Sequence, residues 1–165
     1  MKINFNECGQ NDTFLGRKNE QGSIAMHEIS HGECSCGGTH VKLKLHKPLS
    51  EYTPRRCSCD YCTQHDGIYL SHPKGELLIE ASQPLTEEKQ GSQQATILFC
   101  PACNDLIAVT CQINNQLKGA VRAPLLQDYP VLPPAQTVSP ASLSPEERLN
   151  RWDQVWLSVD LKVAQ

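Results

Sequence analysis

The stretch "CSCDYC" contains three cysteines, Cys57, Cys59 and Cys62, within six positions. Thiolates bind zinc, and tight turns can bring neighbouring sulfurs to the separation of about 3.8 Å that tetrahedral zinc requires. Three protein ligands that leave one position to water or substrate are typical of a catalytic zinc. We therefore predict that these three cysteines hold a metal at which chemistry takes place.

Two further cysteine pairs supply four ligands. Cys34 and Cys36 are separated by one residue and followed by two glycines, and Cys100 and Cys103 are separated by two residues that include a proline. Glycines let the chain fold back so that backbone amides approach the thiolates, and the proline presets a turn. A zinc on these four sulfurs would join segments more than sixty residues apart, which predicts a structural site.

A fourth protein ligand would close the smaller site. His65 follows Cys62 by three residues, and Cys8 and Cys111 belong to neither set. Any of the three could complete a tetrahedral shell, with His65 the leading candidate because of its spacing. The spacing alone leaves this alternative open.

Two arginines, Arg55 and Arg56, stand directly before the three cysteines. Arginine can hold a carboxylate through two parallel hydrogen bonds, but most exposed arginines only pair with nearby acids. We favour the surface role for both. Tyr69, a few residues further on, could cover the metal, although an aromatic residue in a strand is more often core.

The sequence around the cysteines predicts short strands. "THVKLKLH" alternates between apolar and polar residues, which predicts a half-buried strand that places Val41, Leu43 and Leu45 on one face. Further short apolar runs occupy residues 67–71, 76–80, 95–99 and 105–110, separated by turn-forming or polar sequence. This pattern favours a mainly β protein.

Composition changes toward both ends. We expect an N-terminal extension over residues 1–30, with an edge strand or two, a zinc-binding β domain over 31–123, and a proline-rich extended segment followed by a helix over 124–165. Ser144, Pro145 and Glu147 match an N-cap, a first helical residue and a capping box. A stripe of Leu149, Trp152 and Trp156 follows, and we favour its packing on the same domain over a homodimer contact.

Charge and cysteine usage exclude several classes. Fifteen Lys and Arg oppose eighteen Asp and Glu, a net charge of −3, which argues against a nucleic-acid partner. No apolar stretch approaches the roughly 20 residues of a spanning helix, and the opening residues lack the apolar core of a secretory signal. We expect a soluble cytoplasmic protein with no membrane partner. Seven of its nine cysteines lie in three tight clusters, which we expect to bind metal and not to form disulfides.

The stretches "HGECSCGGTHVKLKL", "CSCDYCTQHDG" and "FCPACNDLIAV" follow one another in this order. Together they resemble the glutathione-dependent formaldehyde-activating enzyme and centromere protein V family over roughly Gly32 to Val121. The resemblance implies a β-tent fold of small zinc-stapled antiparallel sheets, with a C-terminal helix expected from the sequence. It also implies two zinc ions per chain, on the same two cysteine sets: Cys34, Cys36, Cys100 and Cys103 for the structural ion, and Cys57, Cys59 and Cys62 for the catalytic one.

Members of that family act as carbon–sulfur lyases that join formaldehyde to glutathione, so the resemblance implies a small-molecule thiol or aldehyde substrate. Thr63 stands where a basic residue commonly follows the cysteine trio, Asn104 replaces a usual glycine, and the long ends have no obvious counterpart. These departures concern the substrate more than the fold. The alternative is a non-catalytic zinc-stapled module for protein interaction, as the centromere-type relatives suggest.

Overall fold

The computed structural model describes residues 17–18, 24–25, 28–139 and 142–165. Eleven strands join in one sheet of order β13-β6-β7-β12-β14-β8-β5-β4, from which β11 branches beside β12 and leads through β10 to β9. The strands are β4 Glu28–Glu33, β5 Thr39–Leu45, β6 Arg55–Cys57, β7 Ile68–Leu70, β8 Glu76–Ala81, β9 Thr86–Lys89, β10 Thr96–Phe99, β11 Leu106–Ile113, β12 Gln116–Arg122, β13 Gln136–Val138 and β14 Leu157–Val163.

The remaining elements are short, apart from one helix. The strands β2 (Arg17–Lys18) and β3 (Ile24–Ala25) form a separate pair. Other elements are the helices α1 (Asp60–Gln64) and α2 (Pro145–Val155), and 3-10 turns at Leu49–Glu51, Ala123–Leu125 and Tyr129–Val131. Most of the expected N-terminal extension lies outside the described residues.

The expectation of a mainly β protein with a C-terminal helix is confirmed. Each of the five strands expected from apolar runs or alternation is present, as β5, β7, β8, β10 and β11. In β5 the even alternation of buried and exposed side chains follows the sequence pattern because successive side chains of a strand point to opposite faces.

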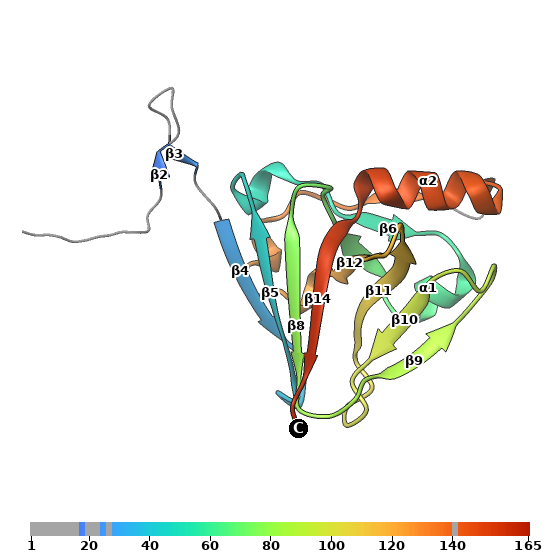
Figure 1. Ribbon diagram of the computed structural model, residues 1–165, viewed down its shortest axis with the longest axis horizontal. Helices are drawn as coiled ribbons and strands as arrows, with labels where there is room; N and C mark the ends of the chain where they lie inside the picture. Colours follow the sequence, from blue (N-terminus) through green and yellow to red (C-terminus); the bar gives the residue numbers. More distant parts are fainter. Residues whose placement is uncertain (1–16, 19–23, 26–27, 140–141) are drawn as a thin grey trace, which may run out of the picture.

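Two groups of strands lean together and enclose the core. One group is β4, β5, β8 and β14, and the other is β9 to β12 (Figure 1). Leu43 and Ile79 from the first group, and Ile107 and Val121 from the second, are fully buried in one cluster. Burying their apolar surface is the main favourable contribution to this packing.

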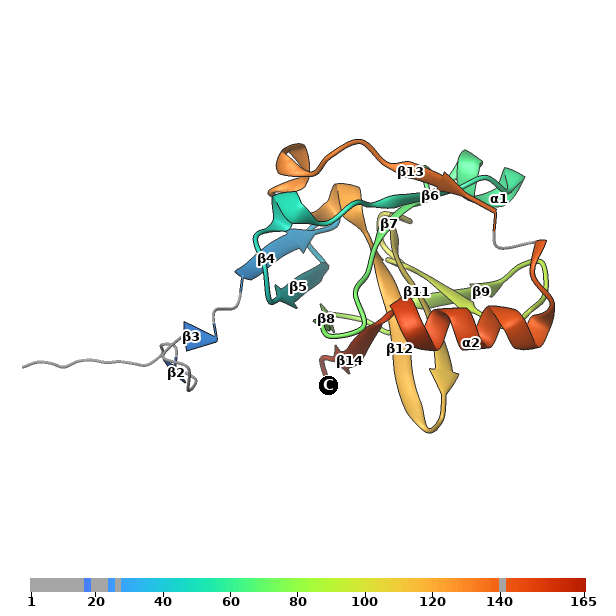
Figure 2. The same cartoon turned by 90° about the horizontal axis from the view of Figure 1, so that it is seen from above.

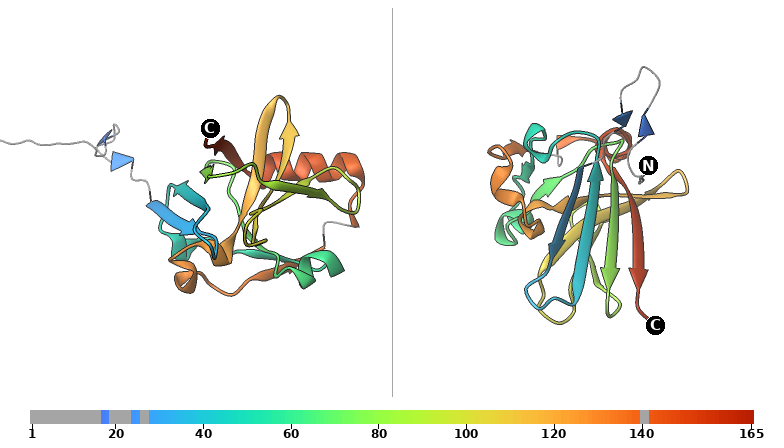
Figure 3. Two further views of the ribbon diagram at one scale, coloured as in Figure 1. Left: turned by 90° about the horizontal axis from the view of Figure 1, so that it is seen from below. Right: turned by 90° about the vertical axis from the view of Figure 1, so that its left-hand side faces the viewer.

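The strand β14 is an element that the sequence prediction did not include. It pairs in parallel with β8 from Ser158 to Val163 (Figure 3), and its first two residues, Leu157 and Ser158, pair with β12. Its residues alternate, but they follow α2 directly at Trp156 without turn-forming residues, so the helical stripe masked the change of period. A second parallel pair joins β13 of the proline-rich segment to β6, the strand that ends at Cys57.

The helix α2 begins as predicted. The Ser144 hydroxyl accepts from the Glu147 N–H, and the Glu147 carboxylate accepts from the Ser144 N–H at 2.8 Å, which completes the capping box. The Lys118 ammonium of β12 contacts Asp153 near the other end of the helix, at 3.4 Å to its carboxylate and 3.2 Å to its carbonyl. The Lys118–Asp153 contact joins α2 to the sheet, across the top of which the helix lies (Figure 1).

No helix among the described residues is both long and apolar enough to cross a membrane.

Candidate metal centres and the cavity beside them

The first cysteine cluster joins two loops that are distant in sequence. The Sγ of Cys36 lies 3.6 Å from those of Cys34 and Cys100, and with Cys103 all four sulfurs fall within 4.8 Å of one another. The N–H groups of Gly38 and Thr39 donate to Cys36 and Cys34 at 3.4 and 3.3 Å. The structure thus brings together the four residues predicted for one site.

A carboxylate braces these two loops from outside the cluster. The Oδ2 of Asp105 accepts from the N–H and the hydroxyl of Ser35, at 2.7 and 2.6 Å. Partial burial raises the pKa of Asp105, but the hydrogen bonds from Ser35 lower it by more, so the net pKa lies below its ordinary value. Asn104 next to it has a φ of 65°, a conformation that Gly and Asn adopt more readily than other residues. This explains how Asn can stand at a position where the family usually has Gly.

The second cluster is built on a strand end and a single helical turn. Cys57 ends β6, Cys59 caps α1, and Cys62 lies within that turn. The Sγ atoms of Cys57 and Cys59 are 3.4 Å apart, the Cys62 N–H donates to the Cys59 sulfur at 3.4 Å, and all three sulfurs lie within 4.8 Å of one another. The three predicted residues therefore converge.

In each cluster one thiol has a lowered pKa. Hydrogen bonds from the Cys62 thiol and from the backbone and thiol of Cys59 lower the pKa of Cys57 to about 6, although partial burial raises it. In the first cluster burial raises the pKa of Cys100, but N–H groups of Cys103 and Ala102 bring it down to about 6. Each cluster thus holds one thiol that ionises near neutral pH, and thiolate is the form that binds metals.

Gly67 and Tyr69 shape the second cluster from behind. A Cβ on Gly67 would lie 2.9 Å from Cys62 Cβ and 3.1 Å from the Tyr69 hydroxyl. The Tyr69 hydroxyl is 3.7 Å from the Cys62 sulfur. The interpretation of Tyr69 as ordinary core is therefore incomplete, because its ring packs inside while its hydroxyl reaches the cysteine trio.

No fourth His, Cys, Asp or Glu from the described parts of the chain joins this trio. The His65 imidazole instead packs between the rings of Tyr61 and Phe99, with centroid distances of 4.6 and 5.4 Å. The Cys111 thiol donates to the Gln94 carbonyl at 3.3 Å and belongs to neither cluster. Cys8, the other candidate, lies outside the described residues.

All three cysteines of the trio line a cavity of about 640 Å³. This volume falls within the range of small-molecule sites. Seen from above, α2 lies on one side and the β13–β6–α1 segment on the other (Figure 2). The lining side chains that matter most here are Arg55, Tyr61, Tyr69, Arg148, Arg151, Trp152 and Trp156.

The two arginines before the trio have different surroundings. Arg56 is exposed and pairs with Asp66 at 3.6 Å, and Asp66 also pairs with Arg122 at 3.3 Å. Arg55 is half-buried, lines the cavity, and donates to the Ser71 hydroxyl at 3.4 Å. The expectation of a surface role thus describes Arg56, whereas Arg55 faces the cavity.

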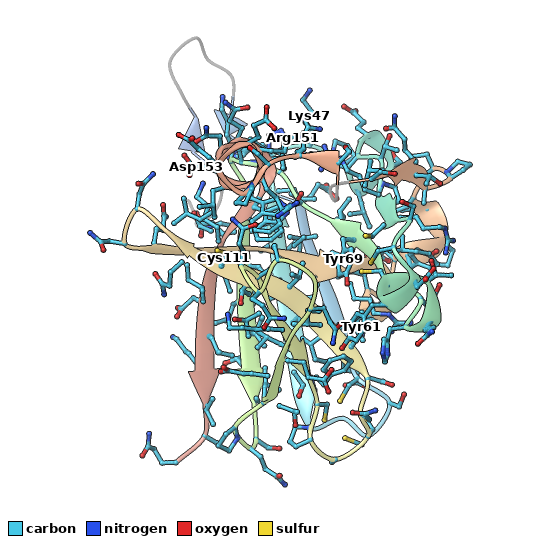
Figure 4. The ribbon with its side chains drawn as sticks, turned by 90° about the vertical axis from the view of Figure 1, so that its right-hand side faces the viewer. Lys47, Tyr61, Tyr69, Cys111, Arg151 and Asp153 are labelled. Atoms are coloured by element: carbon cyan, nitrogen blue, oxygen red, sulfur yellow. The ribbon has the colours of Figure 1, made fainter. Side chains whose placement is uncertain are left out.

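The cavity residues of α2 were not predicted to be near the trio. Trp152 and Trp156 stack with centroids 4.5 Å apart, and Figure 4 shows Arg151 on this helix, above Tyr69 and Tyr61. Because α2 lies more than eighty residues after the trio in sequence, no local spacing could have indicated the contact. The only available signal was the apolar stripe itself.

Both cysteine clusters could hold a metal ion. Every ligand atom is a sulfur, and all eight cysteines of the described residues are free. The Sγ–Sγ distances of 3.4–3.6 Å within the clusters come close to those around tetrahedral zinc. The first cluster offers four ligands and the second three.

Comparison with known proteins gives one family. A family model described as glutathione-dependent formaldehyde-activating enzyme matches residues 29–141. The search of curated proteins found no match. A crystal structure of a Rhodobacter sphaeroides protein is 22% identical, covers 59% of this chain and 87% of its own, and has a TM-score of 0.46.

Proposed function

The chain belongs to the glutathione-dependent formaldehyde-activating enzyme family, and from this premise we propose that it is a zinc-dependent carbon–sulfur lyase. Its substrate is an adduct of formaldehyde, or of a related small aldehyde, with glutathione or another thiol. We expect it to act in the cytoplasm, where thiols and cysteine clusters remain reduced.

One observation carries this proposal: the three-cysteine cluster lines a cavity of ligand size, and none of the four cysteines of the larger cluster lines that cavity. Cys34 and Cys100 of the larger cluster are buried. We assign the larger cluster to a structural zinc that joins two loops. We assign Cys57, Cys59 and Cys62 to a second zinc that substrate can reach.

A zinc ion held by those three thiolates would act as a Lewis acid with one position for a substrate sulfur. In the synthetic direction the thiol sulfur attacks the aldehyde carbon, so that a carbon–sulfur bond forms. The carbonyl π electrons move to oxygen, which takes up the proton given up by the thiol. In the reverse direction the same bond breaks and the aldehyde is released.

The residues around the trio position the reactants. The Tyr69 hydroxyl, 3.7 Å from the Cys62 sulfur, is placed to hydrogen-bond to an oxygen that develops charge beside the cluster. Apolar side chains of α2 and β11 exclude water from the cavity wall, which strengthens such hydrogen bonds.

Paired cysteine variants test the proposal. Cys59→Ser should abolish exchange of ¹³C-formaldehyde with its thiol adduct, followed by NMR, while the protein stays folded. Cys36→Ser should unfold the domain, because it breaks the brace between two loops. An equal loss of stability in both variants would contradict the division into a structural and a catalytic site.

The alternative is a non-catalytic module for protein interaction. Cobalt substitution separates the two functions, because the spectrum of cobalt in the second cluster should change when glutathione binds to the metal. No change with glutathione or with simpler thiols would favour the module.

A further inference from the structure

Part of the cavity wall comes from a segment beyond the family match. The match ends at residue 141, yet Leu143 and the α2 residues Arg148, Arg151, Trp152 and Val155 all line the cavity. Together with Trp156 they face β6 and the cysteine trio across it. The side of the cavity opposite the thiols is therefore a feature of this chain and not of the matched region.

Apart from the cysteine trio, the charged side chains that line the cavity are all positive. Arg55, Arg148 and Arg151 are the charged side chains of the described residues that line it, and no Asp or Glu does so. The chain as a whole carries a net charge of −3, so this cluster of positive charge runs against the overall balance. A cavity wall of this kind selects anionic ligands.

Arg55 and Arg151 come from different parts of the chain and repel each other. Both guanidinium groups line the same cavity and carry the same charge. The structure shows no ion pair for either arginine among the described residues. Two like charges at the wall of one cavity destabilise the unliganded protein, and a bound anion relieves that repulsion.

Arg148 adds a fixed support. It is 9% exposed, and its guanidinium donates to Gln94 Oε1 at 2.5 Å and to the Leu143 carbonyl at 2.7 Å. It precedes Arg151 by three residues, so both lie on the same face of α2. The hydrogen bonds of Arg148 therefore hold that face in place over the cavity.

Apolar side chains also line the cavity. Trp152 stacks almost parallel on Trp156, at 9° and 4.5 Å. Ile97, Val109 and Ala120 of the sheet line the same cavity. A ligand in this cavity can thus contact apolar surface, guanidinium groups and the cysteine trio at the same time.

The strand β6 sets the length of that span. Arg55 and Cys57 are two residues apart in it, so their side chains lie on the same face, roughly 7 Å from each other along the strand. We propose that the cavity binds a thiol whose far end is a carboxylate, held by Arg55 and Arg151, with an apolar chain against Trp152. This inference rests on the proposed function, because the sulfur end is placed at the second cluster.

Intrinsic fluorescence gives a direct readout of the test, because the chain has two tryptophans and both line the cavity. The metal-loaded protein is titrated with 6-mercaptohexanoate, 6-mercaptohexanol and hexanoate. The first two differ only in the carboxylate, and the first and third only in the thiol. We expect 6-mercaptohexanoate to bind at least about tenfold more tightly than 6-mercaptohexanol, the effect of a charged hydrogen bond.

Two arginine variants with the same loss of charge locate the effect. Arg151→Gln, at an exposed position of α2, should reduce the carboxylate preference to less than about threefold. Arg56→Gln, on the outer face of β6, should leave the preference unchanged. Equal binding of the two thiols to the natural protein, or a full preference retained in Arg151→Gln, would overturn the inference.

The third ligand keeps this result separate from the proposed function. If hexanoate binds as tightly as 6-mercaptohexanoate, the sulfur contributes nothing and the thiol chemistry is refuted while the carboxylate site stands. If both thiols bind equally and more tightly than hexanoate, the thiol site stands and the carboxylate site is refuted.

Discussion

A methyl group added at Gly67 should disturb the second cysteine cluster selectively. The Cβ of Gly67→Ala would lie 2.9 Å from the Cβ of Cys62, 3.1 Å from its carbonyl oxygen and 3.1 Å from the Tyr69 hydroxyl. Carbon atoms in contact prefer about 3.5–4.0 Å, so Cys62 or the loop must move by roughly 0.6–1 Å. Metal sites tolerate ligand shifts of only about 0.2 Å.

Two quantities should change in this variant. Overpacking of this kind costs about 1–3 kcal/mol, which lowers the melting temperature by about 2–4 °C for each kcal/mol in a chain of this size. The second metal should also be lost, so that dialysis against a competing chelator leaves about one zinc fewer per chain than in the natural protein. Calorimetry measures the first effect and plasma mass spectrometry the second.

The control is Gly75→Ala. Its added methyl would lie 2.6 Å from Leu157 Cδ2 and 2.9 Å from Leu45 Cδ2, so it overpacks the core without touching either cysteine cluster. It should lower the melting temperature and retain the full metal content. If Gly67→Ala keeps both metals and the natural melting temperature, our account of how Gly67 supports Cys62 is wrong.

Two further predictions concern the helix cap and the loop after Cys103. Hydrogen bonds from the backbone and hydroxyl of Ser144 lower the pKa of Glu147. The stabilisation by this carboxylate is therefore present above its unfolded-state pKa and is lost as the pH falls through the lower folded-state pKa. The melting temperature of Glu147→Gln should lie below that of the natural protein at pH 7, and the gap should close as the pH falls through that folded-state pKa; a gap that stays constant in acid would contradict this sign. Asn104→Ala should lower the free energy of unfolding in urea by about 1 kcal/mol, because φ at this position is 65°. Asn104→Gly should stay within about 0.5 kcal/mol of the natural protein. Equal stability of all three proteins would refute the conformational argument.

Local patterns made much of the fold predictable. Alternation identified β5, and the residue types at 144–147 identified the start of α2, because both depend on neighbours within a few positions. The strand β9 could not be found in this way, since its four side chains are all exposed and carry no apolar signal. The strand β14 was missed because its alternation begins directly at the end of a helix.

The candidate site, too, could be predicted only in part from the sequence. The structure brings the cysteines together in the sets of four and three that their spacing had suggested. The trio lies on one short segment, and each of the two pairs lies in one turn, so local spacing was enough to suggest these units. The cavity was not predictable, since Arg55, Trp152 and Arg151 meet only through the packing of α2 over the sheet. The position of His65 also depended on tertiary contacts, because Phe99, one of the rings beside it, is distant in sequence.

The place of β14 in the sheet has a consequence for biosynthesis. This strand lies between β12 and β8, both of which precede it in the chain, so a nascent polypeptide that has emerged only as far as α2 presents two unpaired edges. Ribosomes add about 5–20 residues per second, so the edge of β8 stays unpaired for several seconds before β14 is made, and the edge of β12 for a shorter time. Unpaired edges recruit other strands, and we expect stalled or prematurely terminated products to aggregate.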